Sequence, residues 1–287
     1  MKNFRNGFIG LLVSAVLTGV IISCGGGSGG SDTPPPAAAA TVIRSASLTG
    51  AQEVPPTGAT GTGRGAVVVN PTTREITGGA TFTGLTGNPI GAHIHRLDTT
   101  IVVGLVQAAD NATATVPAGT VLSAADYAEL LAGYLYFNVH TAANPNGEIR
   151  GQIIGTTGVV AGLATLNGAQ ENSTNTSTAT GRGTVVVDST TREVLIVYVT
   201  HNIAANTTVA HIHTGAPGVS GPANVVTLTL DTVNKIASGP QGATITAQNL
   251  TDLSAGNTYF NVHSTNDLCR PAVDCSAGEI RGQIAIQ

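Results

Sequence analysis

The chain has 287 residues, enough for two domains of ordinary size, and 41 % of them are apolar, so a wholly disordered chain is excluded. Only 10 % of the residues are charged and the formal net charge is −4, a balance that argues against nucleic acid as a partner. Glycine is abundant and tryptophan is absent, a composition that favours short strands joined by many turns over helical bundles.

Residues 1–23 form the first predicted element, an export signal. Lys2 and Arg5 precede an apolar run, Phe8–Ile22, which is too short for a comfortable membrane span and fits a signal peptide. The run ends in Ile-Ile-Ser-Cys, which resembles the lipobox of bacterial lipoproteins. That resemblance implies that Cys24 is lipidated and begins the mature chain; an ordinary signal peptide with an incidental cysteine is the alternative.

Residues 24–41 are rich in Gly, Ser and Pro and cannot form a core, so we expect a tether. Acyl chains at Cys24 would hold the protein on a membrane, with the folded part projecting away from it. Gly25 stands where an Asp would indicate retention in the inner membrane. We therefore expect a lipid-anchored protein of the outer membrane, on its periplasmic face or at the cell surface.

The rest of the chain consists of two successive copies of one sequence unit, which indicates a tandem repeat. The recurring motifs are Gly-Ala-Gln-Glu (50–53 and 168–171), Gly-Arg-Gly (63–65 and 181–183), Thr-Thr-Arg-Glu (72–75 and 190–193), Ala-His-Ile-His (92–95 and 210–213), Tyr-Phe-Asn-Val-His (136–140 and 259–263) and Gly-Glu-Ile-Arg-Gly-Gln-Ile (147–153 and 278–284). We therefore expect two domains, residues 42–155 and 159–287.

Each unit is predicted to consist of strands. Valine-rich runs at 65–70 and 183–188 are closed by turn sequences, and Leu135, Phe137 and Val139 alternate with polar neighbours. One helix is expected over 124–132, where Ser123 and Asp126 form a start that resembles a capping box. The prediction is an all-β chain of two tandem antiparallel β-sandwich or barrel domains, with one short helix in the first.

Six of the seven histidines form two matched sets, and these are the candidate metal ligands. The sets are His93, His95 and His140 in the first unit, and His211, His213 and His263 in the second. In a His-Ile-His strand both imidazoles project to the same side. If the strands of a unit are neighbours, three imidazoles converge outside its core, a ligand set suited to copper or zinc.

Glu148 and Arg150 lie on the same polar strand side in the first unit, as Glu279 and Arg281 do in the second. A Glu in this position can bind the metal or orient a ligand. The alternative is a polar network, in which the histidines hydrogen-bond these Glu and Arg side chains without metal. The sequence leaves the two open. The seventh histidine, His201, has Thr83 at its equivalent position and is treated as incidental.

The second unit has an insertion between its last two motifs, and this insertion holds Cys269 and Cys275. In an exported protein the pair is expected to form a local disulfide, with a soft-metal pair as the alternative. No Gly-x-Ser-x-Gly, phosphate loop or dinucleotide fingerprint occurs, and no catalytic Ser-His-Asp set or carboxylate pair repeats. We therefore assign no catalytic residues and favour a protein that is not an enzyme.

Together, Gly-Ala-Gln-Glu-Val-Pro-Pro (50–56), Ala-His-Ile-His (92–95), Asn-Val-His-Thr (138–141) and Gly-Glu-Ile-Arg-Gly-Gln (147–152) resemble the CHRD domain. This domain is found in chordin and in many exported bacterial proteins. The resemblance covers nearly all of both units and implies an all-β, immunoglobulin-like or barrel fold outside the cytoplasm. It implies little about activity.

A weaker similarity links each unit to copper/zinc superoxide dismutase, a β-barrel with a His-x-His strand, a later strand ending in Val-His and an active-site Arg. It implies that each histidine set binds copper and that Arg150 and Arg281 guide an anion. The bridging histidine, the zinc-loop cluster and the cross-barrel disulfide have no equivalent here, so dismutase activity is not expected. The glycine-rich segment after His213, unlike that after His95, fits the family pattern, so the second site is favoured if a single one functions.

The sequence therefore predicts a lipid-anchored cell-envelope protein whose two domains act in binding or adhesion. Its partners are expected to be the membrane, through Cys24, and a protein or glycan ligand. The alternative is copper or zinc binding by the histidine sets, with a minor redox activity as the further possibility.

Overall fold

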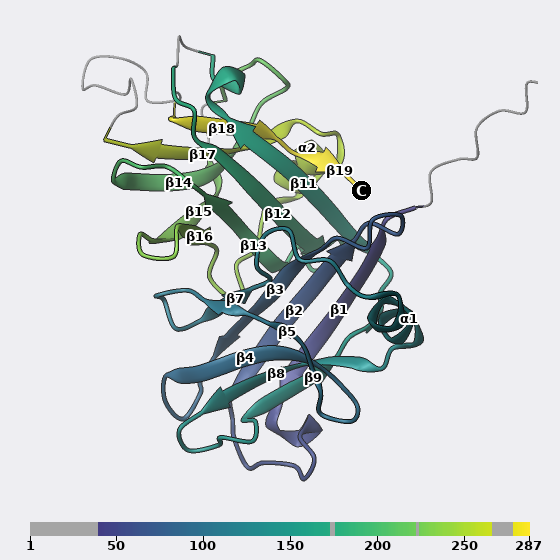
Figure 1. Cartoon of the computed structure of the whole chain (residues 1–287). Helices are drawn as coiled ribbons and strands as arrows, with labels where there is room; N and C mark the ends of the chain where they lie inside the picture. Colours follow the sequence, from purple (N-terminus) through teal and green to yellow (C-terminus); the bar gives the residue numbers. More distant parts are fainter. Residues whose placement is uncertain (1–39, 173–175, 222–223, 266–277) are drawn as a thin grey trace, which may run out of the picture. The chain divides into compact units, whose positions relative to one another are not determined.

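The computed structural model describes residues 40–172, 176–221, 224–265 and 278–287 (Figure 1). Residues 39–287 form one compact unit. Within it, repeat 1 comprises β1 to β10 and repeat 2 comprises β11 to β19. The all-β prediction is confirmed, because strands dominate both repeats and each repeat holds a single α-helix among its described residues.

Repeat 1 forms one antiparallel sheet, in the order β5-β4-β8-β9-β1-β2-β3-β7-β6, with β10 pairing with β1. Its elements are β1 (Val42–Thr49), η1 (Gly50–Gln52), β2 (Thr62–Val69), β3 (Ile76–Thr83), β4 (Pro89–Arg96), β5 (Ile101–Gly104), β6 (Val106–Gln107), β7 (Thr113–Thr115), α1 (Ala124–Ala132), β8 (Leu135–Thr141), β9 (Ile149–Gln152) and β10 (Ile154–Gly155). The two ends of the sheet, β5 and β6, are consecutive in the chain and separated by Leu105, so the sheet curls into a barrel-like layer.

Repeat 2 has the equivalent strand order, and its sheet closes into a barrel because β11 pairs with both β18 and β12. Its elements are β11 (Val159–Asn167), η2 (Gly168–Gln170), β12 (Thr180–Asp188), β13 (Val194–His201), β14 (Thr207–Thr214), β15 (Asn224–Asp231), β16 (Ile236–Ser238), α2 (Ala247–Ser254), β17 (Thr258–Ser264), β18 (Ile280–Gln283) and β19 (Ala285–Ile286). One strand, β15, pairs with both β14 and β16 and takes the place of β5 and β6. Antiparallel closure leaves few free strand edges.

Each repeat encloses its own hydrophobic core. In repeat 1 the predicted alternation on β8 is confirmed, since Leu135, Phe137 and Val139 are buried in one cluster with the side chains of β2 and β3. Gly65 of the Gly-Arg-Gly motif permits this packing, because a Cβ there would lie 2.6 Å from Cε2 of the Phe137 ring. Gly183 has the same relation to a phenylalanine ring in repeat 2.

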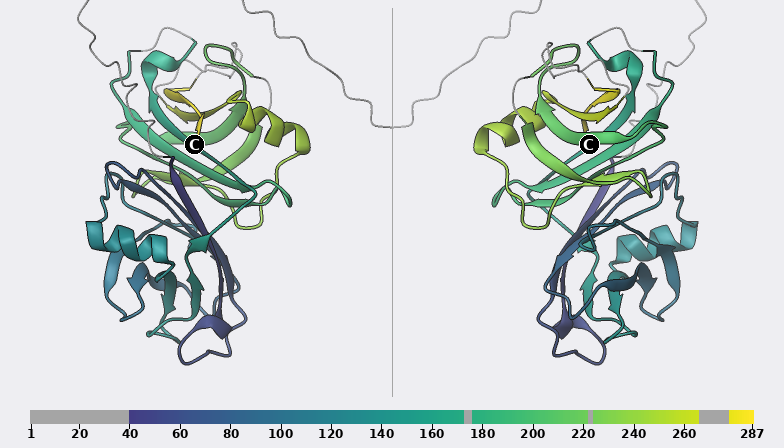
Figure 2. Two further views of the ribbon diagram at one scale, coloured as in Figure 1. Left: turned by 90° about the vertical axis from the view of Figure 1, so that its right-hand side faces the viewer. Right: turned by 90° about the vertical axis from the view of Figure 1, so that its left-hand side faces the viewer.

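The helix predicted over 124–132 is confirmed as α1, with Ser123 as its N-cap accepting a hydrogen bond from the amide of Asp126. The second helix, α2, was not predicted. Thr246 caps it through the amide of Asn249, so the acidic residue that marked the first helix is missing from its start. Figure 2 shows α1 in teal and α2 in yellow-green, each beside the sheet of its own repeat.

The two repeats contact each other through equivalent surfaces of β2, β3, β12 and β13. Arg64 pairs with Glu193 at 3.4 Å and Arg182 pairs with Glu75 at 2.6 Å, a reciprocal arrangement of residues that correspond between the repeats. Reciprocal contacts of this kind are typical of a two-fold interface between identical subunits. The contact between the two repeats of this chain therefore resembles the contact between the two subunits of a homodimer.

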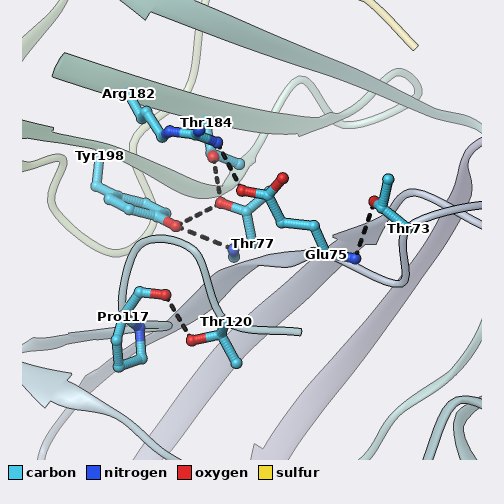
Figure 3. Close-up of polar contacts among 9 residues, drawn as sticks. Thr73, Glu75, Thr77, Pro117, Thr120, Arg182, Thr184 and Tyr198 are labelled. Carbon is cyan, nitrogen blue, oxygen red and sulfur yellow. Dashed lines mark hydrogen bonds and ion pairs between the residues drawn. The ribbon is translucent and has the colours of Figure 1, made fainter. Parts of the chain in front are cut away.

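Beside a hydrophobic cluster shared by the two repeats, the junction holds a group of polar contacts (Figure 3). The hydroxyl of Tyr198 lies 2.6 Å from Oγ1 of Thr77 and accepts a hydrogen bond from the amide of Gly78. Oγ1 of Thr77 also lies 2.7 Å from that of Thr184. A cavity of about 350 Å³ lies at the junction and is lined by residues of both repeats.

Three predicted features lie outside the described residues: the signal segment 1–23, the lipidation site Cys24 with most of its tether, and the pair Cys269 and Cys275. Among the residues that the structure describes, no helix has the length and apolar character needed to cross a membrane.

Candidate metal centre

Strands β4 and β8 pair directly and bring the first histidine set together. His93 lies opposite Asn138 and His95 opposite Tyr136, while a register shift places His140 opposite Gly91. The ligand nitrogens of His93, His95 and His140 all lie within 4.8 Å of one another. The adjacency on which the sequence interpretation depended is therefore present in repeat 1.

The hydrogen bonds of the ring nitrogens fix which atoms face the centre of this cluster. Nδ1 of His95 lies 2.8 Å from the carbonyl oxygen of Thr99, and Nδ1 of His140 lies 3.1 Å from that of Pro145. A carbonyl can only accept, so each Nδ1 carries the proton and each Nε2 keeps its lone pair in the neutral ring. Nδ1 of His93 lies 3.1 Å from Nε2 of His140.

Nε2 of His95 is buried and, among the described residues, has no hydrogen-bond partner. The backbone that holds this ring is itself unusual, because Thr99 has a φ of 71°, which is costly for a β-branched residue. The turn thus presents the Thr99 carbonyl to His95 and leaves the other ring nitrogen turned toward the cluster.

Repeat 2 builds the same cluster on β14 and β17, where the ligand nitrogens of His211, His213 and His263 also lie within 4.8 Å of one another. Nδ1 of His213 lies 3.3 Å from the carbonyl oxygen of Gly221, and its Nε2 lies 3.3 Å from Nδ1 of His211. In both repeats the first histidine presents Nδ1, and the second presents Nε2.

Burial keeps these imidazoles neutral. Desolvation is the largest cause that lowers the pKa of His93, His95 and His213, and it lowers the pKa of His140 and His211 to about 4. The neighbouring imidazoles add to the effect, because a second positive charge in the cluster is unfavourable. Neutral imidazole is the form that binds metal.

A stacked column adjoins each cluster. In repeat 1 the His95 and Tyr136 rings are stacked with centroids 5.3 Å apart, and Cζ of Arg150 lies 3.6 Å from the centroid of the Tyr136 ring. Repeat 2 has the same column of His213, Tyr259 and Arg281, with distances of 5.2 Å and 3.5 Å. The two Arg residues differ in environment. Arg150 is half-buried, whereas Arg281 is fully buried.

The two predicted carboxylates have other partners. Glu148 is fully buried and accepts hydrogen bonds from Thr86, Thr141 and Asn144, and these bonds lower its pKa despite desolvation. Glu279 accepts hydrogen bonds from Ser177 and Ser264. Both carboxylates therefore hold loops beside the clusters through hydroxyl and amide groups.

Three buried carboxyl residues were not singled out from the sequence: Glu53, Glu171 and Asp231. Glu53 is 6 % exposed, and burial raises its pKa from 4.5 to about 7, against the opposing effects of Arg150 and Asn138. A Cβ on Gly147 would lie 2.6 Å from Oε1 of Glu53 and 2.5 Å from Oδ1 of Asn138, so both oxygens face this glycine. The Gln-Glu pair that recurs at 52–53 and 170–171 was the available signal, but the sequence assigns it no role beyond that of a repeat motif.

His201 lies apart from both clusters. It is 9 % exposed at the end of β13, its Nδ1 accepts a hydrogen bond from the amide of Ile203, and burial lowers its pKa to about 4. It is a buried histidine of repeat 2.

Residues 44–153 and residues 163–284 each match the family model of the CHRD domain. The chain belongs to the CHRD-domain family. Its two CHRD domains are the two repeats of the structure, so the family resemblance of the sequence motifs is confirmed. Comparisons with curated proteins and with solved structures gave no significant match.

The sequence motifs that resemble the CHRD domain lie within the matched ranges and also supply the cluster residues. Ala-His-Ile-His lies on β4 and β14, Asn-Val-His lies on β8 and β17, and the Arg of Gly-Glu-Ile-Arg lies on β9 and β18. In both CHRD domains the motif strands are neighbours in the order β4-β8-β9 and β14-β17-β18. The family motifs thus converge on one face of each barrel.

Proposed function

We propose that each CHRD domain of this protein binds one copper or zinc ion through its three histidines. The observation that carries the proposal is the convergence of three imidazole nitrogens within 4.8 Å in both domains. Imidazole suits both metals, and three protein nitrogens with an open fourth position are a common ligand set for them.

The spacing of the nitrogens supports this proposal. An ion held at about 2.0–2.1 Å by three imidazoles separates the nitrogens by roughly 3.3–3.6 Å. The distance of 3.1 Å between His93 and His140, and that of 3.3 Å between His211 and His213, are already close to this value. In each domain the ligand nitrogen of the remaining imidazole lies within 4.8 Å of the other two.

The second support is the orientation of the rings. Metal-binding histidines commonly donate their other ring N–H to a carbonyl or carboxylate, which fixes the tautomer and raises the basicity of the ligand atom. His95, His140 and His213 make this bond to backbone carbonyls. A buried polar atom without a partner is costly, and Nε2 of His95 is such an atom among the described residues. A bound metal ion would give this nitrogen a partner.

The alternative polar network required hydrogen bonds from the histidines to the neighbouring Glu and Arg residues. In domain 1, Glu148 instead bonds Thr86, Thr141 and Asn144, and Arg150 stacks on Tyr136. The network therefore leaves His95 without a partner for Nε2, which a metal ion would supply. This difference favours the metal site.

The rest of the proposal concerns location and role. We propose that the mature protein is held on the outer membrane by lipid at Cys24 and that it binds metal in the cell envelope without catalysis. The signal-like segment 1–23 and the lipobox-like end support this location. Adhesion to a protein or glycan partner is the alternative role for the paired domains.

The experiment is native mass spectrometry of residues 39–287, loaded separately with Zn²⁺ and Cu²⁺ and then dialysed. We expect two equivalents for the wild-type sequence and one for His211→Ala/His263→Ala. We expect His201→Gln, a histidine variant outside both clusters, to retain two. Absence of retained metal in a folded wild-type protein would refute the proposal.

A further inference from the structure

The Arg–Tyr–His column places a fixed positive charge beside a site that offers no negative ligand. In domain 1, Cζ of Arg150 lies 3.6 Å from the centroid of the Tyr136 ring, and the His95 ring stacks on Tyr136 at a centroid distance of 5.3 Å. The guanidinium is therefore within about 9 Å of the His95 ring. An Arg side chain keeps its charge at any accessible pH.

The charge of Arg150 is not cancelled by a close partner. In the described part of the chain it forms no ion pair, and its side chain donates a hydrogen bond to the neutral amide of Gln152 at 3.5 Å. Burial raises the pKa of the Glu53 carboxyl to about 7 against the opposing effect of Arg150, so this carboxyl is a weaker counter-charge than an ordinary glutamate. The Tyr136 ring holds the guanidinium by cation–π attraction without neutralising it.

The histidine cluster of domain 1 offers no carboxylate to offset this charge, because its three grouped ligand residues in the described part of the chain are all histidines. Glu148, which is buried nearby, accepts hydrogen bonds from Thr86, Thr141 and Asn144 instead.

We infer that the Arg150–Tyr136–His95 column biases the domain 1 site toward monovalent copper and against divalent ions such as zinc. The inference rests on the proposed function, because it concerns the ion that the three histidines hold. Three neutral imidazoles add no charge to the site, so a divalent ion meets twice the repulsion that a monovalent ion meets. The charge therefore shifts the selectivity of the site toward Cu⁺, in addition to the bare capacity to bind metal.

The size of the bias follows from Coulomb's law. One unit of charge at roughly 10 Å in an effective dielectric constant of about 20 to 40 changes a binding constant by roughly four- to fifteenfold. Arg150 is half-buried, so solvent reduces the effect toward the lower end. We expect removal of the charge to raise the affinity for Zn²⁺ relative to that for Cu⁺ by about three- to tenfold.

The test isolates domain 1 by using a background with His211→Ala and His263→Ala. Zn²⁺ affinity is measured by competition with a chelator, and Cu⁺ affinity is measured anaerobically with a reductant and a chromogenic chelator. The variants are Arg150→Gln and Arg150→Met, which are neutral, and Arg150→Lys, which keeps the charge. Arg150 lies on the short strand β9 and is half-buried, and circular dichroism verifies the fold of each variant.

We expect both neutral variants to raise the ratio of Zn²⁺ to Cu⁺ affinity three- to tenfold, and Arg150→Lys to change it less than twofold. An unchanged ratio in either folded neutral variant would overturn the inference while leaving metal binding intact. Failure of the background protein to bind either ion would instead refute the proposed function. The two failures are therefore distinguishable.

Discussion

Replacement of Glu53 by Gln tests the electrostatics of the buried polar layer in domain 1. The side chain is 6 % exposed, and burial raises its pKa from 4.5 to about 7. The folded chain therefore binds this proton more tightly than the unfolded chain does. The stability from this group is complete below about pH 4.5 and is lost as the pH rises through 7.

The magnitude follows from the shift. A change of one pKa unit corresponds to about 1.4 kcal/mol, so ionisation of Glu53 costs on the order of 3 kcal/mol of folding free energy at pH 8. A glutamine side chain has the same shape and no charge to bury, and its amide N–H can donate to the unpartnered Oδ1 of Asn138. We expect Glu53→Gln to exceed the stability of the wild type by roughly 1 kcal/mol at pH 5 and by up to about 3 kcal/mol at pH 8.

The assay is urea unfolding of wild type and variant at pH 5, 6, 7 and 8, with the difference in free energy taken at each pH. The buried histidines titrate in both proteins, so their contribution cancels in this difference. The change in this difference between pH 5 and pH 8 reports the titration of Glu53, because packing changes contribute equally at both pH values. A difference that is constant across the four pH values would refute the assignment of a raised pKa to Glu53.

Three further outcomes are expected. Gly65→Ala should lower the free energy of unfolding by about 1–3 kcal/mol, because the new Cβ would lie 2.6 Å from a buried phenylalanine ring. The control Gly104→Ala, which has open space around it, should leave the melting temperature unchanged. Tyr198→Phe should destabilise the chain by about 1–3 kcal/mol, since its hydroxyl makes two hydrogen bonds across the repeats, and an unchanged urea midpoint would contradict this role. Bound zinc should persist at pH 5.5 and be released near pH 4, because burial lowers the pKa of His140 to about 4 and protons compete poorly with the metal above that pH. A zinc indicator follows the release, and release near pH 6.5 would contradict this expectation.

The periodicity of the sequence predicted the faces of the strands. Alternation placed Phe137 toward the core and Asn138 and His140 together on the opposite side, and the structure has this arrangement. It also placed both imidazoles of His-Ile-His on one side. These predictions succeed because side-chain direction in a strand depends on local geometry alone.

The assembly of the site was not predictable in the same way. Strands β4 and β8 are separated along the chain by β5, β6, β7 and α1, so their pairing depends on how the whole sheet closes. The shift that sets His140 opposite Gly91 comes from a register irregularity, which alternation alone does not reveal. The Arg–Tyr–His column has the same origin, because it requires Tyr136 to lie opposite His95.

Glu53 shows why residue type alone was insufficient. A Glu next to a proline pair is ordinarily part of a solvated turn, and charged residues are mostly exposed. Here η1 turns the chain so that the carboxyl enters the layer between Arg150 and Asn138. Its burial depends on the distant glycine at 147, which leaves the space that the carboxyl occupies.

The central claim is that three imidazoles in each CHRD domain converge on one metal ion. Anomalous diffraction from crystals of residues 39–287 grown with Zn²⁺, recorded at the zinc absorption edge, tests it most directly. We expect two anomalous peaks, one bounded by Nδ1 of His93 with Nε2 of His95 and His140, and one within the His211, His213 and His263 cluster. Zinc peaks elsewhere on the chain, with both clusters free of anomalous density, would contradict it.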